Sequence, residues 1–290
     1  MKLKNLFFCA AIALLAASCS ADRDRCCCPT PVNVHITDFS LWQEDLQATK
    51  AMESVEACSS VRSVTLAFFD ANGDAAYSST QLKADEGTFD TFGDFSLALP
   101  YGSYKMVVIA HGGDFPITLS SLSEAGFGSE KPKETFLYSR DVNITNSTPV
   151  NLSATLSRII TRLIVKASET MPENLHAVRI SFSKGGVSFN PMSGNSATDT
   201  GFVNTIYTTS APGSVLQLRT TFFIASASDN IDITIETLDA DQNVLNRRTI
   251  AAVPFVRNRA TFLTGSLFST NSSASFSVET SYENDYYMNF

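Results

Sequence analysis

Apolar residues recur at every second position in many short segments of this chain, and this period constrains its fold more than any other feature. Val32, Val34 and Ile36 alternate with Asn33 and His35. A period of two is typical of a β-strand with one buried face. The same alternation is found in residues 64–68, 95–99, 104–110, 150–156, 178–182, 216–224, 231–235, 260–264 and 276–280. Turn residues separate these segments, so we predict an all-β fold built from β-sandwiches.

Local patterns also predict how some of these strands are connected. The Asn72-Gly73 pair favours a hairpin, because this pair accepts positive φ at low cost. Residues 95–99 and 104–110 flank the turn sequence Pro-Tyr-Gly and predict a second hairpin. Helical patterns are few and short, in residues 44–57 and 121–126.

The composition excludes several classes of protein. Of the 290 residues, 44% are apolar and 17% are charged, which excludes a disordered chain and a membrane protein with several spans. The formal charge of −8 argues against nucleic-acid binding, because an acidic surface repels phosphate. The length predicts two domains. A polar stretch at 143–149 places their boundary, and we expect an N-terminal sandwich at 30–150 and a C-terminal sandwich at 151–290.

Residues 1–18 have the pattern of a signal peptide. Lys2 and Lys4 precede an apolar run at 6–17, which is too short to span a bilayer as a stable helix. Cys19 follows the small residues at the end of this run, as the cysteine does in a bacterial lipoprotein signal. We expect lipid attachment at Cys19 and a lipidated tether at 19–29. The alternative is an ordinary secretory signal with a coincidental cysteine.

Four further cysteines follow the tether cysteine: Cys26, Cys27, Cys28 and Cys58. Export permits disulfide bonds, and Cys58 can pair with one of the three adjacent cysteines, which rarely pair with each other. The pairing is left open. The Cys-Cys-Cys sequence lacks the two-residue spacer of a zinc site, so we expect no metal there.

The sequence contains no recognised motif for catalysis. It has no Gly-x-Ser-x-Gly elbow, no Walker loop and no His-Glu-x-x-His. Asp70, Asn72 and Asp74 have the spacing of calcium ligands, but Ala75 and Gln81 replace the glycine and glutamate of a calcium loop. This cluster therefore favours a hairpin turn. We predict no catalytic, cofactor-binding or metal-binding residues, no cofactor and no enzymatic activity.

Four stretches, taken in order, resemble the fimbrillin family of Bacteroidales, whose members build type V pili. The first holds a polar tether, a Cys-Pro and a strand, and the second holds a strand with an Asn-Gly turn. The third is an Arg-bearing strand that opens the second domain, and the fourth is a late strand with an Arg-Asn pair. They read RDRCCCPTPVNVHI, VRSVTLAFFDANGD, LSRIITRLIVKAS and VPFVRNRATFLTGSLF.

The resemblance implies a fold and a function. The fold is two tandem transthyretin-like, Greek-key β-sandwiches with few short helices. The function is that of a fimbrial (type V pilus) subunit, a lipoprotein of the outer membrane exposed at the cell surface. Acyl chains such as palmitate on Cys19 would hold it in the lipid bilayer. Its partners would be other fimbrial subunits, joined by β-augmentation to support adhesion.

In shaft subunits of that family, an arginine-specific protease removes the first strand, and a C-terminal strand of the next subunit fills the groove. Between Ile36 and Val61 this chain has no arginine, and Lys50 is its only basic residue there. We therefore expect the first strand to be retained, as in an anchor or minor subunit. Residues 276–282 are either a donor strand for a neighbour or the last strand of the C-terminal sandwich.

An alternative function is that of an outer-membrane surface lipoprotein that binds carbohydrate. Such a site normally presents exposed aromatic side chains to the sugar. Trp42 is the only tryptophan of the chain, and the tyrosines are scattered, so the sequence offers little support for this alternative.

Overall fold

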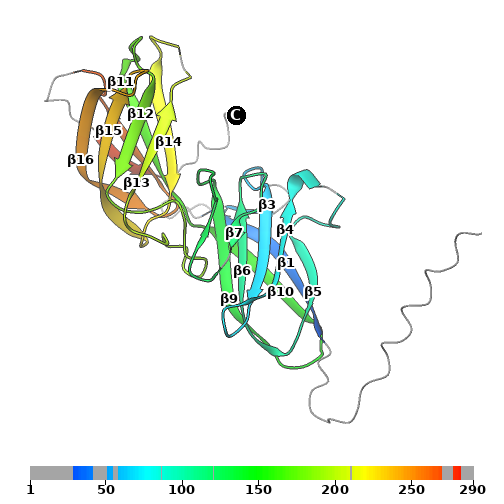
Figure 1. Cartoon of the computed structure of the whole chain (residues 1–290). Coiled ribbons are helices and arrows are strands. Elements are labelled where there is room, and N and C mark those ends of the chain that lie inside the picture. Colours follow the sequence, from blue (N-terminus) through cyan, green and yellow to red (C-terminus); the bar gives the residue numbers. More distant parts are fainter. Residues whose placement is uncertain are drawn as a thin grey trace, which may run out of the picture.

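The structure is a computed structural model, and it describes residues 29–41, 51–54, 58–85, 87–119, 121–209, 211–269 and 277–281. The predicted all-β fold is confirmed (Figure 1). Among the described residues the one helical element is η1 (Lys83–Asp85), a short 3-10 helix. The N-terminal half, residues 29–158, contains β1 (Thr30–Leu41), β2 (Ala51–Ser54), β3 (Ser63–Phe69), β4 (Ala75–Leu82), β5 (Asp94–Leu99), β6 (Gly102–His111), β7 (Thr118–Leu119), β8 (Ala125–Gly126), β9 (Thr135–Ile144) and β10 (Val150–Arg158).

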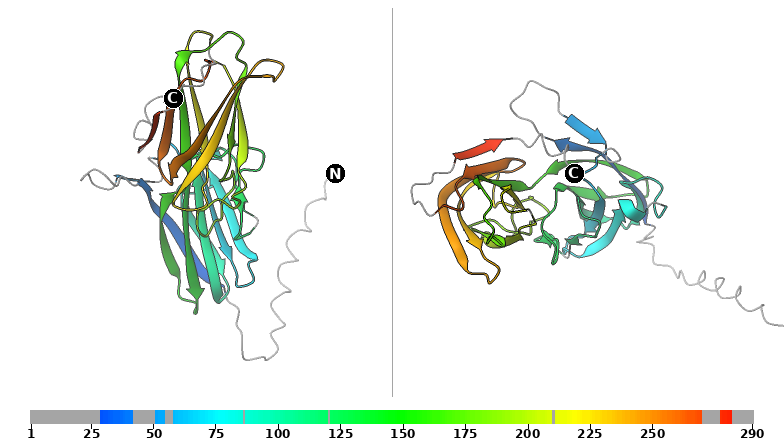
Figure 2. Two further views of the ribbon diagram at one scale, coloured as in Figure 1. Left: turned by 90° about the vertical axis from the view of Figure 1, so that its left-hand side faces the viewer. Right: turned by 90° about the horizontal axis from the view of Figure 1, so that it is seen from above.

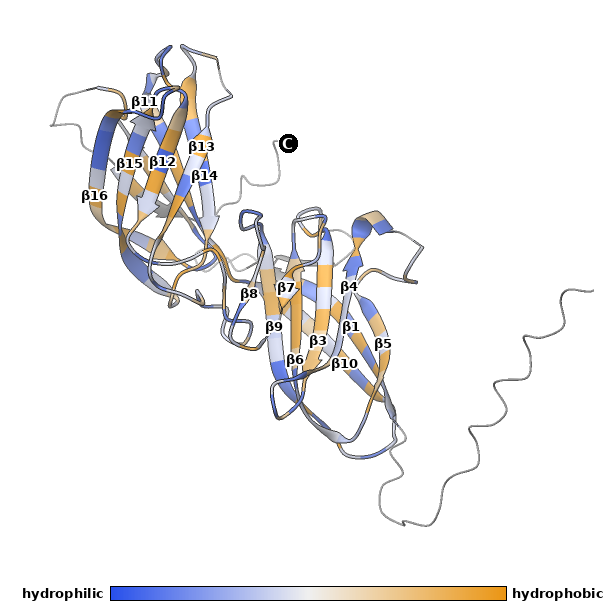
Figure 3. Cartoon of the chain, in the orientation of Figure 1, coloured by the Kyte–Doolittle hydropathy of each residue, from blue (hydrophilic) through white to orange (hydrophobic). Residues whose placement is uncertain are grey.

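The strands of the N-terminal half form a sandwich, because one long sheet bends back on itself. Its order is β2-β1-β10-β9-β6-β3-β4, with β5 also beside β1. Only two residue pairs join β9 to β10, and the sheet bends at this point. Alternate residues of β1 and β3 consequently face the same core, although three strands separate them in the sheet. Figure 3 shows the apolar residues along β6, whose neighbours lie on both of its edges.

The C-terminal half, residues 161–281, is a second sandwich of two four-stranded sheets. Their orders are β14-β11-β17-β18 and β13-β12-β15-β16, and side chains of both sheets form one core. The strands are β11 (Thr161–Thr170), β12 (Ala177–Phe182), β13 (Phe202–Tyr207), β14 (Val215–Phe222), β15 (Ser228–Leu238), β16 (Val244–Val256), β17 (Ala260–Gly265) and β18 (Ser277–Ser281).

The two halves repeat one topology, a repeat that the sequence does not reveal. In each half the first strand pairs in parallel with a late strand, β1 with β10 and β11 with β17. In each half the first strand also has one long antiparallel neighbour, β5 or β14. The opposite sheets correspond as well, with β4-β3-β6-β9 matching β13-β12-β15-β16. The strand β18 has no counterpart in the described part of the N-terminal half.

A third apolar cluster joins the halves. It includes Phe69 and Ile109 of the first sandwich and Phe189 and Phe223 of the second. Ala125 and Phe189 exchange two backbone hydrogen bonds, of 2.7 and 2.9 Å, across the junction. Buried contacts of this kind oppose relative motion of the two sandwiches. β10, which ends at Arg158, pairs with β1 and β9 of the first sandwich, and β11 of the second sandwich starts at Thr161.

The predicted hairpin at residues 95–110 is wrong. β5 pairs with β1 and β6 pairs with β3 and β9, so the chain crosses from one layer of the sandwich to the other at Pro100–Tyr101. The Tyr104 hydroxyl donates to the Pro100 carbonyl over 2.9 Å and closes this crossing. Alternate residues of both strands, such as Phe95 and Leu99 of β5 and Met106 of β6, face the same core, and alternation does not specify which strand is the neighbour.

The predicted helices also differ from the structure where it describes them. Residues 51–54 form β2, which pairs with Asp38–Leu41 of β1, and residues 125–126 form β8. Pairing with an existing strand satisfies the backbone groups of β2, and this outweighs a weak helical pattern. The rest of the expected helix at 44–57 lies largely outside the described residues.

Candidate functional site

The candidate site is β1, the strand on which the expected assembly mechanism depends. β1 lies between β10, which is parallel to it, and β5 and β2, which are antiparallel. Val32, Val34 and Ile36 are at most 2% exposed and face the first core. Burying aliphatic side chains of this size contributes about 2 kcal/mol each, so β1 stabilises the sandwich considerably.

A register shift extends the buried face of β1. Between Ile36 and Asp38 the pairing with β10 skips one residue. The extra residue reverses the alternation and turns Phe39 into the core, where its ring lies 4.8 Å from that of Phe136. The strand therefore remains anchored over most of its length.

The outward face of β1 is bound to both neighbouring strands by polar side chains. Asn33 donates to the Asn151 side chain of β10 over 2.9 Å and accepts from Ser96 of β5 over 3.0 Å. His35 pairs with Asp94 on β5. At the buried start of β1, Thr30 donates to the carbonyl of Asn146, in the loop before β10, over 2.7 Å. These contacts join β1 to both strands beside it.

Arg62 is the first arginine after β1, and its backbone is held by neighbouring segments. Its N–H donates to the His111 carbonyl over 2.9 Å, and its carbonyl accepts from Lys83 N–H over 2.8 Å. Its guanidinium pairs with Asp114. A protease must pull a substrate into an extended conformation, so these bonds oppose cleavage after Arg62.

Several predicted residues lie outside the described residues, including the signal peptide, Cys19, most of the tether, Lys50 and Trp42. Cys26, Cys27 and Cys28 lie there too, so the disulfide pairing stays a prediction. Cys58 is buried, with its sulfur 3.2 Å from the Ser60 hydroxyl.

The acidic cluster after β3 forms the predicted hairpin turn. The Asp70 carboxylate accepts the Asn72 N–H over 2.8 Å and the Asp74 N–H over 3.0 Å. These bonds lower the pKa of Asp70 below its ordinary value, and the bond from the Asp74 N–H has the largest effect. The Asp70 carboxylate therefore stabilises the turn that it belongs to, in which Gly73 has a φ of +85°. Within the described ranges, no group of three His, Cys, Asp or Glu side chains could hold a metal ion.

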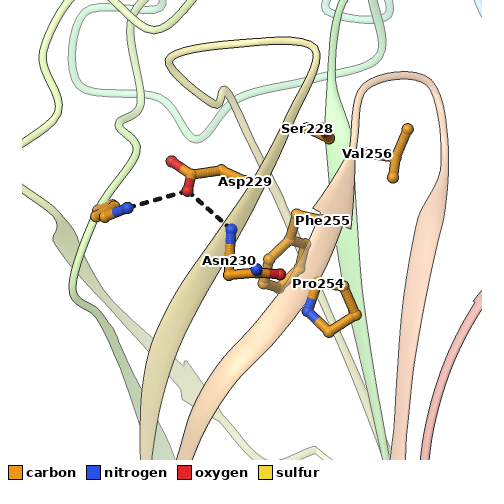
Figure 4. Close-up of a pocket in the computed structure, with 7 residues that line it drawn as sticks. Ser228, Asp229, Asn230, Pro254, Phe255 and Val256 are labelled. Carbon is orange, nitrogen blue, oxygen red and sulfur yellow. Dashed lines mark hydrogen bonds and ion pairs between the residues drawn. The ribbon is translucent and has the colours of Figure 1, made fainter.

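The C-terminal half carries a pocket of about 360 Å³ beside β15 and β16 (Figure 4). The Lys184 ammonium lies 3.0 Å from the Asp229 carboxylate, which also accepts the Asn230 N–H over 2.8 Å. The lining aromatic residue, Phe255, is fully buried. This pocket therefore lacks the exposed ring on which a sugar stacks.

The last described strand belongs to the C-terminal sandwich. β18 pairs with β17 of its own chain through five residue pairs, from Ala260–Ser281 to Thr264–Ser277. This pairing favours the interpretation of residues 277–281 as the last strand of the C-terminal sandwich over their interpretation as a free donor strand.

Residues that sequence reasoning missed lie at the junction. Glu134 forms ion pairs with Arg158 and Arg162 and accepts a hydrogen bond from Arg162 over 3.0 Å, and all three side chains are nearly buried. An arginine within an apolar strand is a signal that an acidic partner is needed, and the stretch at 158–165 carries two arginines. Nothing in the sequence indicates that the partner is Glu134, which lies in a loop.

The structure contains no helix, in the ranges it describes, that is both long and apolar enough to cross a membrane. Comparison with known proteins places the chain in a family. It belongs to DUF6562, a family of unknown function, whose model matches residues 114–289. None of the curated proteins matches the chain.

Several solved structures from Bacteroides and Porphyromonas species are similar to this chain. A candidate adhesin from Bacteroides ovatus has 11% identity and a TM-score of 0.53, with 88% of this chain and 97% of that chain covered. Candidate polysaccharide-binding proteins from Bacteroides thetaiotaomicron have 12% identity, a TM-score of 0.49 and coverages of 88% and 99%. The fimbrial anchor protein Mfa2 from Porphyromonas gingivalis has 11% identity, a TM-score of 0.47 and coverages of 87% and 97%. The likeness to the candidate adhesin shows a shared fold.

Proposed function

We propose that this chain is a membrane-anchored minor subunit of a cell-surface fimbria of the fimbrillin type. It keeps its first strand, joins other fimbrial subunits by β-augmentation and supports adhesion, without enzymatic activity. The observation that carries the proposal is the position of β1, which lies inside the first sandwich with strands on both edges. The fold shared with a candidate adhesin supports it.

Retention of β1 links the sandwich to the membrane. A strand paired on both edges leaves no groove for a donor strand at its own position. The absence of arginine between Ile36 and Val61, together with the bonded backbone of Arg62, favours an intact connection between β1 and the rest of the first sandwich. The tether ends at Cys19, where acyl chains would hold the protein in the outer membrane, with both sandwiches displayed at the cell surface.

We infer that the chain forms two domains joined rigidly, one ending at Arg158 and the other starting at Thr161. Each half has its own apolar core, which is the mark of a domain. The third cluster between them supports a fixed relative orientation. A rigid pair suits an anchor, because it transmits a pulling force from partner to membrane.

Replacing Cys19 by alanine is expected to release the protein from the membrane. Without the thiol no lipid is attached, and the acyl chains that contribute about 0.8 kcal/mol per buried methylene are lost. The measurement is labelling with radioactive palmitate, combined with partitioning between detergent and aqueous phases. The wild-type chain should take up label and enter the detergent phase.

Cys27→Ala is the matched control, because it removes a nearby cysteine outside the lipoprotein motif. It should keep both the label and the detergent partition. Label retained by Cys19→Ala would contradict lipid attachment at this residue.

A further inference from the structure

The repeated topology leaves one edge of the first sandwich open. In the C-terminal half, β17 has β11 on one edge and β18 on the other. In the N-terminal half, one edge of the counterpart strand β10 pairs with β1. Among the described residues, the other edge of β10 pairs only with β9, at Ser157 and Arg158. Residues 150–156 therefore form an edge in the position that β18 covers in the other half.

The open edge has the character of a strand-binding site. Val150 and Leu152 are half-buried at the first core, as is Tyr138 on β9 across the bend. Residues 150–157 include no charged residue and no proline, the usual devices that protect an edge. The edge strand β16, by contrast, carries Arg247 and Arg248. Alternate apolar side chains of an added strand would fill the space beside Leu152.

The path of β18 leads toward this edge. Ser281 lies opposite Ala260, which lies opposite Arg162 at the start of β11, so β18 ends beside the junction. β18 runs antiparallel to β17, and β17 runs parallel to β11, so β18 runs antiparallel to β11. β11 in turn follows β10 after only two residues. Both views in Figure 2 place β17 and β18 on the same side of the molecule as β1. A chain that keeps the direction of β18 enters the N-terminal half antiparallel to β10.

Residues 282–290 have the length and the pattern that this edge requires. Nine residues span about 30 Å as a strand, against about 23 Å for the seven open positions of β10. Tyr286, Met288 and Phe290 alternate with Tyr287 and Asn289. One face of such a strand is therefore apolar and suits Val150 and Leu152.

We propose that residues 282–290 add to the open edge of β10 as an antiparallel strand of the same chain. They close the first sandwich as β18 closes the second. A molecule that closes its own edge offers no strand-accepting site there, which suits a subunit that ends a fibre. The inference rests on the proposed function in one respect, because β10 has a single open edge only while β1 is retained.

Hydrogen exchange of the full chain, purified in detergent, tests this inference. Those amides of residues 150–156 that point away from β1 should exchange at least about tenfold faster when the chain is cut back to Ser281, because their hydrogen-bonding partners are lost. Met288→Asp should produce the same loss, since it places a charge on the apolar face. Tyr287→Asp, on the opposite face, is the matched control and should leave exchange unchanged. Amides of β3, far from the edge, should be unaffected in every variant.

Three results would overturn the inference. One is equal exchange at 150–156 with and without the tail. Another is loss of protection throughout the core, which would indicate general destabilisation. The third is protection that appears only with increasing protein concentration, because the strand would then come from a second copy. The mass of the N-terminus, measured on the same samples, shows independently whether β1 is retained.

Discussion

Replacing Glu134 by glutamine is expected to lower the free energy of unfolding by about 3–5 kcal/mol, because two nearly buried arginines lose their counter-charge. Glu134 lies in the N-terminal half, and Arg162, which is 3.0 Å from it, lies in the C-terminal half. Arg162 also donates to Thr221 over 3.1 Å, and Arg158 donates to Asn258 over 3.2 Å. The neutral amide can replace a hydrogen bond but not the charge.

Urea denaturation measures this effect. Glu130→Gln is the matched control, because Glu130 is an exposed glutamate four residues earlier, and it should change stability by less than about 0.5 kcal/mol. A loss below about 1 kcal/mol for Glu134→Gln would contradict the view that this cluster holds the halves together.

Acidification from pH 6.5 to pH 4 is expected to destabilise the protein by about 3 kcal/mol through His111 alone. Burial lowers the pKa of His111 to about 4, the main cause being the loss of water around its charged form. Its Nδ1 accepts the Gly113 N–H over 3.1 Å, and the rings of Phe115 and Phe127 lie 5.3 and 5.4 Å away. The folded protein therefore favours the neutral form of the His111 ring over the protonated form.

The sign follows from the depressed pKa. Above pH 6.5 the histidine is neutral in both the folded and the unfolded chain, and its contribution is fully present. As the pH falls toward 4, the unfolded chain gains a proton that the folded chain resists, and stability is lost. Carboxylates with a lowered pKa, such as Glu236, begin to cost stability only as the pH falls toward their ordinary value, so the loss between pH 6.5 and 5 reports mainly on His111.

Unfolding followed at several pH values checks this expectation. His111→Phe should flatten the profile between pH 6.5 and 5, since phenylalanine keeps the aromatic contacts but cannot be protonated. His176→Gln, at an exposed histidine, is the matched control and should keep the wild-type slope. An unchanged slope in His111→Phe would show that other groups cause the acid sensitivity.

Alternation in the sequence was sufficient to predict the fold class and the inward residues of most strands. It could not show that β5 and β6 face each other across the core, because a hairpin and a crossing between the two layers of a sandwich produce the same pattern. It also could not place Phe39, which a register shift turns inward. Both errors concern partners distant in the chain, and a local period contains no information about them.

The candidate site was only partly predictable for the same reason. The sequence identified the first strand and the lack of arginine after it. It did not show that β1 pairs in parallel with β10, a strand more than a hundred residues later, or that the late edge of β10 stays open. Nor did it pair Glu134 with Arg158 and Arg162, because the loop that carries the acid has no regular period.

In our proposal β1 stays in the mature protein and connects the first sandwich to the membrane. The intact mass of the protein isolated from the cell envelope tests it most directly. We predict an N-terminus at Cys19 that carries acyl chains, with residues 30–41 present. An N-terminus at Ala51 or Ser63 would contradict the claim, since the protein would then have lost β1 and resemble a shaft subunit.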